Sequence, residues 1–467
     1  MMTVLSGSSA GPRGHNRFGA GSLLMQAGLA VLLTTALEVS AAPITTGTGP
    51  GGLGTVDGAS NLELWLNAAS MASGSVGTWN DASGNGYDAA QGNGSHQPVV
   101  VENVLNTDLS VVRFDGADDT MDVDSNLGTT LNNANAATGF LVFVSRGKTT
   151  AKSTTRNGGA WNFGTRFHSN HHGGQSGQDD LYDDFAASDR PKIGDLVGLD
   201  VPAIQTMSNT SNASTFTGWY DGAQVHNSDQ SYAVRSTPEI GGTDAGYLYN
   251  GDIGEVTVFS GAVTGPARVI MENYLSAKWD IGLNAGGGAL DVYAGDTNAN
   301  GDYDFGVFGI GAAGGSSVTN SGQQGFGFEA TGGTLADGEY LLAGHLGDSH
   351  ATTTADIPGS MDLRWERVWF VDETGDIDVD MAFDFSDAGL SAPGFVRDYH
   401  LLYANDSGLS FTGIGTAASV VGDTVTFSVP GSTLTSGYYT LGIEIPEPAS
   451  IAVLLLAVAG LSLRRRH

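Results

Sequence analysis

The chain has 467 residues, with 70 glycines, 13 prolines and 40% hydrophobic residues, which is rich in turn formers yet apolar enough to exclude a disordered chain. It has 19 basic and 50 acidic residues, and this net charge of −31 repels nucleic-acid phosphates and anionic membranes. Cysteine is absent, which excludes disulfides, thiolate metal sites and a cysteine nucleophile. The length predicts two folded units plus terminal segments.

The first 42 residues have the pattern of a secretory signal peptide. Arg13 and Arg17 precede a mostly apolar segment at 23–37, and Val39 and Ala41 are small residues at the positions that signal peptidase recognises. The alternative is a membrane anchor, which needs about 20 apolar residues in a row. We expect residues 1–42 to be a signal peptide and the protein to be exported.

Residues 53–285 are expected to form a β-sandwich. Short apolar or alternating segments are separated by clusters of glycine, asparagine and aspartate, a pattern typical of short antiparallel strands. One helix is expected near the end of this unit, with Thr264 as its N-cap, Pro266 in its first turn and Trp279 closing its apolar face. The expected strands are 99–104, 109–114, 140–144, 215–220 and 255–259.

Five short motifs occur in this unit, in the order LELWLN at 62–67, WNDASGNG at 79–86, VRFDG at 112–116, WYDG at 219–222 and GDIGEV at 251–256. Together they resemble the LamG-like jelly-roll domains, and the helix that ends in Lys278 and Trp279 also matches bacterial members of that family. The resemblance implies a concanavalin A-like sandwich over 53–285. It further implies glycan or protein binding at the sandwich rim, sometimes with calcium.

The same fold class contains polysaccharide hydrolases, which need two carboxylates about 5–9 Å apart. The best candidates are Asp252 and Glu255, whose spacing of three predicts opposite faces of a strand. We therefore expect structural roles for these acids, no catalytic residue and a protein that is not an enzyme.

Two further features of this unit could bind a ligand. Trp219 and Tyr220 could stack on a sugar, although alternate residues of their strand are expected to fill the core. Imidazole and carboxylate groups cluster in a Gly- and Ser-rich stretch, which is a transition-metal site or a solvated loop. The clustered residues are His168, His171, His172, Asp179, Asp180, Asp183 and Asp184.

Residues 290–445 begin with a candidate calcium loop. Its oxygen-bearing residues are Asp296, Asn298, Asn300, Asp302 and Asp304. Oxygen ligands at alternate positions, with glycine sixth, are similar to the first half of an EF-hand loop. The twelfth position is Val307 instead of the bidentate glutamate, so the sequence predicts a weak calcium site, with a polar turn as the alternative.

The remainder of 290–445 is expected to form a second β-sandwich, which makes the fold all-β with two tandem sandwiches. Residues 377–385 alternate between apolar and acidic side chains, as in a strand with one buried face. The turn at 373–376 is expected to connect two paired antiparallel strands. The expected strands are 340–343, 363–371, 377–385, 399–403, 424–429 and 438–443.

The C-terminal segment 446–467 has three parts: Pro446, Glu447 and Pro448, then an apolar segment at 451–463, then Arg464, Arg465 and Arg466. Thirteen apolar residues are shorter than the roughly 20 that span a bilayer, so they favour a transient transmembrane helix. In order and composition the segment resembles the PEP-CTERM sorting signal. That resemblance implies an exosortase partner, cleavage near the Pro-Glu-Pro motif, and the surface, outer membrane or matrix of an exopolysaccharide-producing Gram-negative bacterium. The alternative is a simple tail anchor.

These features favour a non-catalytic surface protein that recognises a glycan or exopolysaccharide. The alternatives are a purely structural matrix protein and, third, a polysaccharide hydrolase of the concanavalin-like fold. The acidic charge disfavours a nucleic-acid partner.

Overall fold

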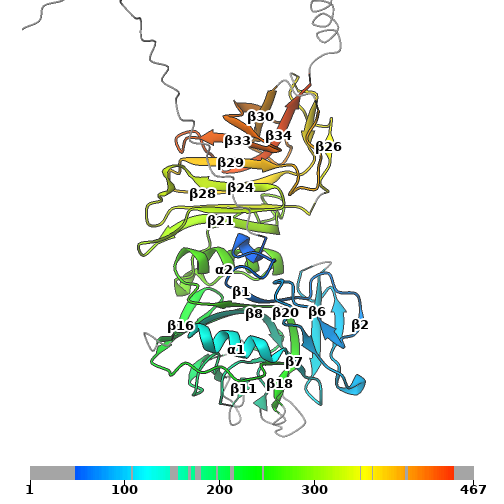
Figure 1. Cartoon of the computed structure of the whole chain (residues 1–467), viewed down its shortest axis with the longest axis vertical. Helices are drawn as coiled ribbons and strands as arrows, with labels where there is room; N and C mark the ends of the chain where they lie inside the picture. The colour runs from blue at the N-terminus through cyan, green and yellow to red at the C-terminus, as the bar shows by residue number, and fades with distance from the viewer. Residues whose placement is uncertain are drawn as a thin grey trace, which may run out of the picture. The chain divides into compact units, whose positions relative to one another are not determined.

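The computed structural model describes residues 48–445, apart from 107–108, 148–155, 167–169, 174–179, 196–197, 211–214, 244–246, 348, 360 and 395–397 (Figure 1). The predicted signal peptide and the predicted sorting signal lie outside the described residues. Within the described part of the chain, no helix has both the length and the apolarity needed to span a bilayer.

The first β region is built on a large antiparallel sheet, sheet 1. Its strand order is β16-β15-β14-β8-β20-β6-β5-β2, and β1 also pairs with β20. The strands are β1 (Leu62–Asn67), β2 (Gly74–Ser75), β5 (Val99–Glu102), β6 (Ser110–Asp115), β8 (Ala136–Ser145), β14 (Pro202–Thr210), β15 (Thr215–Tyr220), β16 (Ala223–Ser228) and β20 (Asn250–Ser260).

Shorter strands form the second layer of this region. Sheet 2 has the order β10-β17-β7-β4-β3, sheet 3 has the order β13-β12-β11-β9, and β18 pairs with β19. Their bounds are β3 (Thr78–Trp79), β4 (Ala89–Ala90), β7 (Met121–Val123), β9 (Arg156–Asn157), β10 (Trp161–Asn162), β11 (Asn170–Gly173), β12 (Asp180–Tyr182), β13 (Lys192–Asp195), β17 (Glu239–Ile240), β18 (Gly242–Thr243) and β19 (Tyr247–Leu248). Leu64 and Phe143 of sheet 1 share one buried core with Trp79, Met121 and Trp161 of sheet 2, so the arrangement is sandwich-like.

Within the described residues, helices α1 and α2 belong to the first region (Figure 1). Helix α1 (Ser125–Ala134) was not expected from the sequence, and the Asp124 side chain caps it by accepting the Asn126 N–H at 2.8 Å. Helix α2 (Pro266–Trp279) was expected, but Gly265 occupies its N-cap with φ 58°, so the assignment of Thr264 was wrong. Helix α2 packs on the second face of sheet 1 through residues such as Met271, and it also contacts β21.

The second β region has two facing antiparallel sheets. Sheet 4 has the order β22-β21-β25-β28-β34-β27-β26, with β30 paired to β34 and to β31, and sheet 5 has the order β23-β24-β29-β33-β32. Sheet 4 contains β21 (Phe305–Ala313), β22 (Ser316–Val318), β25 (Tyr340–His345), β26 (Thr352–Thr353), β27 (Leu363–Trp365), β28 (Trp369–Thr374), β30 (Asp398–Ala404), β31 (Thr412–Thr416) and β34 (Gly437–Glu444). Sheet 5 contains β23 (Asn320–Gln323), β24 (Phe326–Ala330), β29 (Val379–Asp384), β32 (Ser419–Val421) and β33 (Thr424–Val429). Short 3-10 turns occupy Pro50–Gly52, Gly94–His96, Ala285–Gly287 and Thr331–Gly333.

Two expectations for this region were wrong and one was confirmed. The turn at 373–376 connects β28 of sheet 4 to β29 of sheet 5, so it crosses between layers instead of closing a hairpin. The expected strand 363–371 is two strands, β27 and β28. The alternation along β29 is as predicted, because Val379, Met381 and Phe383 lie in the core between the two sheets.

Candidate functional site

Four of the five short motifs meet around β1 and β20, whereas WYDG lies at the end of β15, separated from β20 by β14 and β8. Strand β1 pairs with β20, and the loop that follows β3 is bonded to β1. The Asp81 Oδ1 atom accepts the Trp65 N–H at 2.9 Å, and the Asn85 Nδ2 atom donates to the Leu62 carbonyl at 2.9 Å. These motif residues therefore hold neighbouring segments of the sandwich together.

Glu255 lies at the centre of an enclosed polar cluster. It is 1% exposed, and its Oε2 atom accepts from Lys278 Nζ at 2.6 Å and from Trp279 Nε1 at 2.9 Å. Its Oε1 atom accepts from Trp65 Nε1 at 2.6 Å and from the Tyr274 hydroxyl at 3.0 Å. Burial lowers the pKa of Lys278, and the Glu255 carboxylate acts in the opposite direction. The cluster joins α2 to sheet 1 through a hydrogen-bonded ion pair.

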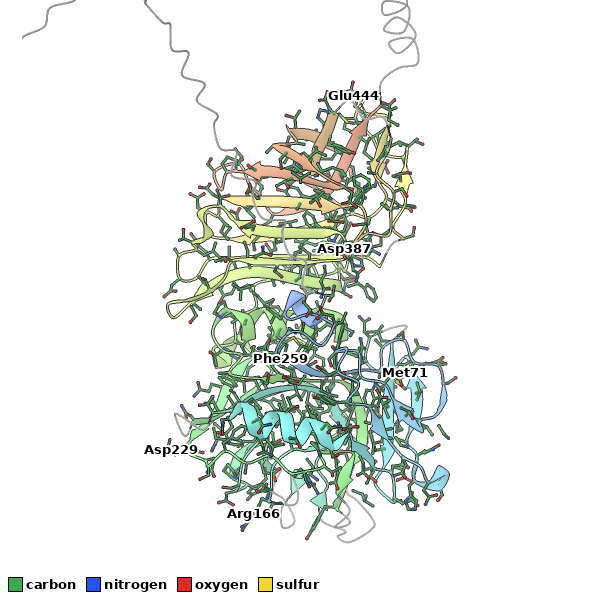
Figure 2. All side chains as sticks on the ribbon, viewed as in Figure 1. Met71, Arg166, Asp229, Phe259, Asp387 and Glu444 are labelled. Carbon is green, nitrogen blue, oxygen red and sulfur yellow. The ribbon has the colours of Figure 1, made fainter. Side chains whose placement is uncertain are left out.

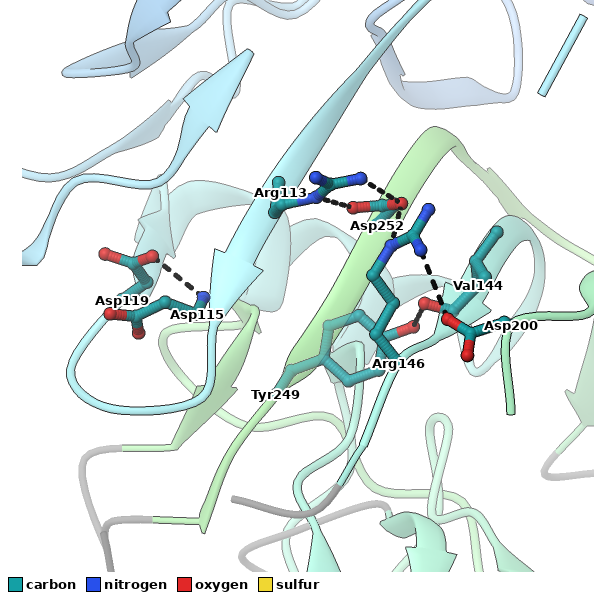
Figure 3. A network of polar contacts seen from close by, with 8 residues as sticks. All are labelled: Arg113, Asp115, Asp119, Val144, Arg146, Asp200, Tyr249 and Asp252. Atoms are coloured by element: carbon teal, nitrogen blue, oxygen red, sulfur yellow. Dashed lines mark hydrogen bonds and ion pairs between the residues drawn. The ribbon is translucent and has the colours of Figure 1, made fainter. Parts of the chain in front are cut away.

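Asp252 lies at the centre of a second cluster, shown in Figure 3. Its side chain is fully buried and receives Arg113 Nε at 2.6 Å, Arg113 Nη2 at 3.1 Å and Arg146 Nε at 2.5 Å. Arg146 Nη1 also reaches Asp200 at 3.1 Å. The side chains of Arg113 and Arg146 are 35% and 30% exposed, so both guanidinium groups reach solvent while a buried carboxylate fixes them.

The expectation that Asp252 and Glu255 occupy opposite faces of their strand was wrong. Asp252 pairs with Val144 and Glu255 pairs with Val142. Residues two apart on β8 share a face, so the two acids share one as well. The register shift makes Gly254 an extra residue, and such a β-bulge reverses the alternation of side chains beyond it.

Close packing explains why glycine occupies the bulge. A Cβ atom on Gly254 would lie 3.0 Å from the indole ring of Trp279. The bulge is also where the partner of β20 changes, because β6 pairs with residues 250–253 and β1 pairs with the segment that begins at Glu255.

Sharing a face does not make these acids a catalytic pair. A glycosidase needs one carboxylic acid that reaches the leaving oxygen and a second carboxylate that reaches water or the sugar. Asp252 is enclosed by two arginines and Glu255 by a lysine and three neutral donors, and both are shielded from solvent. Both acids therefore have structural roles.

Three aspartates lie beside the Asp252 cluster: Asp115 ends β6, and Asp118 and Asp119 lie in the loop that follows it. One carboxylate oxygen from each of Asp115, Asp118 and Asp119 lies within 4.8 Å of the other two. Asp119 accepts the Asp115 N–H at 3.0 Å (Figure 3), and burial raises the pKa of Asp119 to about 6. These loop acids lie at the end of sheet 1, where β6 ends and β20 begins.

The predicted calcium loop is a compact turn between Gly295 and Tyr303. The Asn300 amide nitrogen donates to the Ala294 carbonyl at 2.7 Å, and Asn298 is exposed. Gly301 has φ 96° and Asp302 has φ 58°, which produces the sharp turn that the glycine predicted.

The structure brings the two ends of that loop near each other. Burial, followed by the charges of Asp291 and Asp304, raises the pKa of Asp296 to about 7. Burial also raises the pKa of Asp304 to about 6. Among the described residues, two groups of three acidic or histidine side chains have ligand atoms within 4.8 Å, and neither includes this loop. The loop is a cluster of crowded acids whose calcium binding stays a prediction.

The other candidate residues from the sequence are either buried and engaged by neighbouring side chains or not described by the structure. Trp219 is 8% exposed, with the Arg268 guanidinium 4.8 Å from its ring centre, so it is not a free stacking surface for a sugar. Asp183 is fully buried and accepts from Trp161 Nε1 and Gln205 Nε2, each at 2.7 Å. His168 is outside the described residues, and the side chains of His171 and His172 are not described.

The second group of three ligand-bearing residues, Asp398, His400 and Glu444, was missed by the sequence analysis. So were the arginines around Asp252. Both sets join residues that are far apart in the sequence, so no local sequence pattern predicts either set.

Comparisons with known proteins establish no family. No family model matches the chain, and no curated protein matches it. Among solved structures, domain 4 of the extracellular arabinanase AbnA of Geobacillus stearothermophilus, in complex with arabinotriose, matches with 10% identity and a TM-score of 0.32, over 45% of this chain and 97% of that one. Trypanosoma rangeli sialidase in complex with sialic acid matches with 13% identity and a TM-score of 0.32, over 52% of this chain and 37% of that one.

The binding domain of Botulinum neurotoxin DC, in complex with rat synaptotagmin II, matches with 10% identity and a TM-score of 0.30, over 84% of this chain and 96% of that one. Likenesses this distant carry no argument about function.

Proposed function

We propose that this chain is an exported, non-catalytic surface or matrix protein that binds a glycan or exopolysaccharide at the rim of its first β region. We further propose that residues 446–467 are a sorting signal processed by an exosortase. The observation that carries the non-catalytic part is the enclosure of Asp252 and Glu255, because these acids come nearest to a hydrolase pair and both are engaged by buried or partly buried cations.

The rim that we propose for binding is defined by Arg113, Arg146, Asp115, Asp118 and Asp119. It lies where β6 and β8 end and β20 begins, since Asn250 pairs with Asp115 and Gly251 pairs with Ser145. Guanidinium groups donate hydrogen bonds and carboxylates accept them, so the two together can engage the hydroxyl groups of a sugar.

The buried Asp252 carboxylate prepares this rim for binding. It holds both guanidinium groups in place before any ligand arrives, which lowers the side-chain entropy lost on binding. The neighbouring loop acids offer hard oxygen ligands, so a calcium ion between Asp115, Asp118 and Asp119 would join the rim to a glycan hydroxyl.

A glycan array tests this proposal. We expect reproducible binding by the full-length protein in the presence of Ca²⁺, and at least a tenfold weaker signal after chelation or in Asp118→Asn. Asp118 is exposed, so the variant is expected to fold normally. Asp229→Asn, an exposed acid elsewhere in the first region, is the matched control and should bind as the wild type does.

Two other results would replace the proposal. A blank array would favour the purely structural matrix protein. Release of reducing ends from several polysaccharides would favour the hydrolase and would require an acid pair other than Asp252 and Glu255.

Mass spectrometry of the mature protein, from host cells with and without the exosortase, tests the sorting signal. We expect a mature form that begins near Ala42 or Pro43 and ends near Pro446 only when the exosortase is present. A C-terminus that extends to His467 in both strains would instead indicate a tail anchor.

A further inference from the structure

Three potential metal ligands lie together where β30 begins and β34 ends. In the antiparallel pair, Asp398 lies opposite Glu444 and His400 lies opposite Gly442. Asp398 and His400 alternate along β30 and therefore share a face with Glu444. One ligand atom from each of the three lies within 4.8 Å of the other two, and His400 Nε2 lies 3.8 Å from Glu444 Oε2 (Figure 2 marks Glu444).

His400 Nε2 lies 3.8 Å from Glu444 Oε2, beyond hydrogen-bond distance. This Nε2 atom is shielded from solvent and has no hydrogen-bond partner among the described residues. The His400 side chain is 18% exposed, so the ring remains reachable from solvent. A shielded ring nitrogen without a partner is unfavourable, and coordination of a metal ion would satisfy it.

The register of β30 and β34 places two carboxylates opposite each other. Directly opposed side chains of like charge destabilise an antiparallel pair. Asp398 and Glu444 are opposed in this way, and a cation held between them would convert their repulsion into attraction.

We propose that Asp398, His400 and Glu444 bind a divalent transition-metal ion. One imidazole nitrogen with two carboxylates suits Zn²⁺ or Mn²⁺ better than Ca²⁺, which prefers oxygen ligands alone. Two zinc bonds of about 2.1 Å at a tetrahedral angle place their ligand atoms about 3.4 Å apart, which is close to the 3.8 Å observed here. Three protein ligands leave a coordination position open to water or to an outside ligand.

The candidate metal site lies at the end of the last described strand, β34. Glu444 is the last residue of β34 and precedes Pro446 by two residues. A bound ion would tie the end of β34 to the beginning of β30, so it would fix the last strand where the described chain ends.

Isothermal titration of the full-length protein with Zn²⁺ tests the proposal. We expect His400→Ala and Glu444→Gln each to weaken one saturable binding event at least tenfold. His226→Ala, which removes a half-buried histidine bonded to Ser228, should leave this event unchanged. Titration with Ca²⁺ should show no competition for it.

Two more variants separate this site from other zinc ligands. A His171→Ala/His172→Ala double variant removes two histidines of the His-rich stretch, and we expect it to retain the event. Circular dichroism in EDTA should show that His400→Ala and Glu444→Gln are folded. Wild-type affinity in His400→Ala, loss of the event in the double variant alone, or no saturable zinc binding by the wild type would each overturn the proposal.

Discussion

The acids of β20 are buried, the acids of the loop at 291–304 are exposed or only partly buried, and the charges around the two sets are opposite. Glu255 is enclosed by the Lys278 ammonium group and three neutral donors. Asp296 is half-buried near the carboxylates of Asp291 and Asp304, and its pKa is raised to about 7. The fold satisfies the first carboxylate completely and leaves the second in an unfavourable environment.

This difference separates residues that define a fold from residues that are free to bind something. The acids of the GDIGEV motif hold the sandwich together through buried ion pairs. Conversely, the crowded acids of the loop and of the rim are held in place at a cost in stability, and a cation would remove that cost. The buried acids of this motif therefore support the fold more strongly than they support a binding site.

The largest effect is expected from Glu255→Gln. The variant keeps the size of the side chain but leaves the buried Lys278 ammonium group without its anionic partner. Breaking a buried ion pair from one side typically costs about 3–5 kcal/mol of unfolding free energy. Urea unfolding followed by tryptophan fluorescence measures this loss, since Trp65 and Trp279 both contact Glu255.

Glu102→Gln is the control for that experiment, because Glu102 is exposed on β5 of the same sheet. Its unfolding free energy should stay within about 0.5 kcal/mol of the wild type. A loss below about 1 kcal/mol in Glu255→Gln would contradict the structural role that we assign to this acid.

A smaller loss is expected from Asp252→Asn. The variant removes the charge that holds two guanidinium groups, but these are 35% and 30% exposed and water partly replaces the lost contacts. We therefore expect a loss of about 2 kcal/mol, less than in Glu255→Gln. The urea midpoints of the two variants, measured side by side, show which variant loses more stability. A larger loss in Asp252→Asn would contradict the role that we give to solvent exposure.

Local patterns predicted much of the fold, because strands and helices depend on nearby residues. The β15 and β33 strands have the bounds expected from their apolar and β-branched residues, and helix α2 begins at the expected Pro266. Helix α1 was missed, since only Leu127, Gly128 and Leu131 of its ten residues are buried and its sequence is mostly polar. Its start depends on the cap at Asp124, a signal too common in loops to predict a helix.

Contacts between distant segments explain most of what the sequence did not predict. Nothing near Gly254 indicates a bulge, because the bulge depends on the Trp279 ring and on the change of partner strand. Asp398 and Glu444 meet only through the pairing of β30 with β34. Alternation along one strand cannot reveal such pairings.

The contrast between the two sets of acids also predicts a dependence on pH. The folded-state pKa of Asp296, about 7, lies above its ordinary value of 3.8, so its contribution to stability is fully present below about pH 4 and is lost as pH rises to 7. Asp296→Asn has no carboxyl group to ionise, so its stability does not fall in this pH range for this reason. Allowing for partial solvent exposure, we expect it to be more stable than the wild type by about 1–2 kcal/mol at pH 8 and equal to it at pH 4.

The measurement is urea unfolding in EGTA at a series of pH values from 4 to 8. Asp302→Asn is the matched control from the same loop, because asparagine tolerates the φ of 58° at that position. It should not reproduce the gain. If the difference between Asp296→Asn and the wild type were the same at pH 4 and pH 8, the crowding of the loop acids would not be its cause.

The smallest expected effect is stabilisation by calcium. It tests whether a cation can compensate the loop carboxylates as Lys278 compensates Glu255. A weak site with a Kd of about 1 mM gives about 1.4 kcal/mol of stabilisation in 10 mM Ca²⁺ at pH 7.5. We expect the wild type to gain more than Asp304→Asn, which keeps only the contribution of calcium at the rim, as measured by urea unfolding with and without EGTA. An equal gain in Asp304→Asn and its loss in Asp118→Asn would assign all of the stabilising calcium to the rim. In that case the loop at 291–304 would be a polar turn whose crowded acids destabilise it with no ion to compensate.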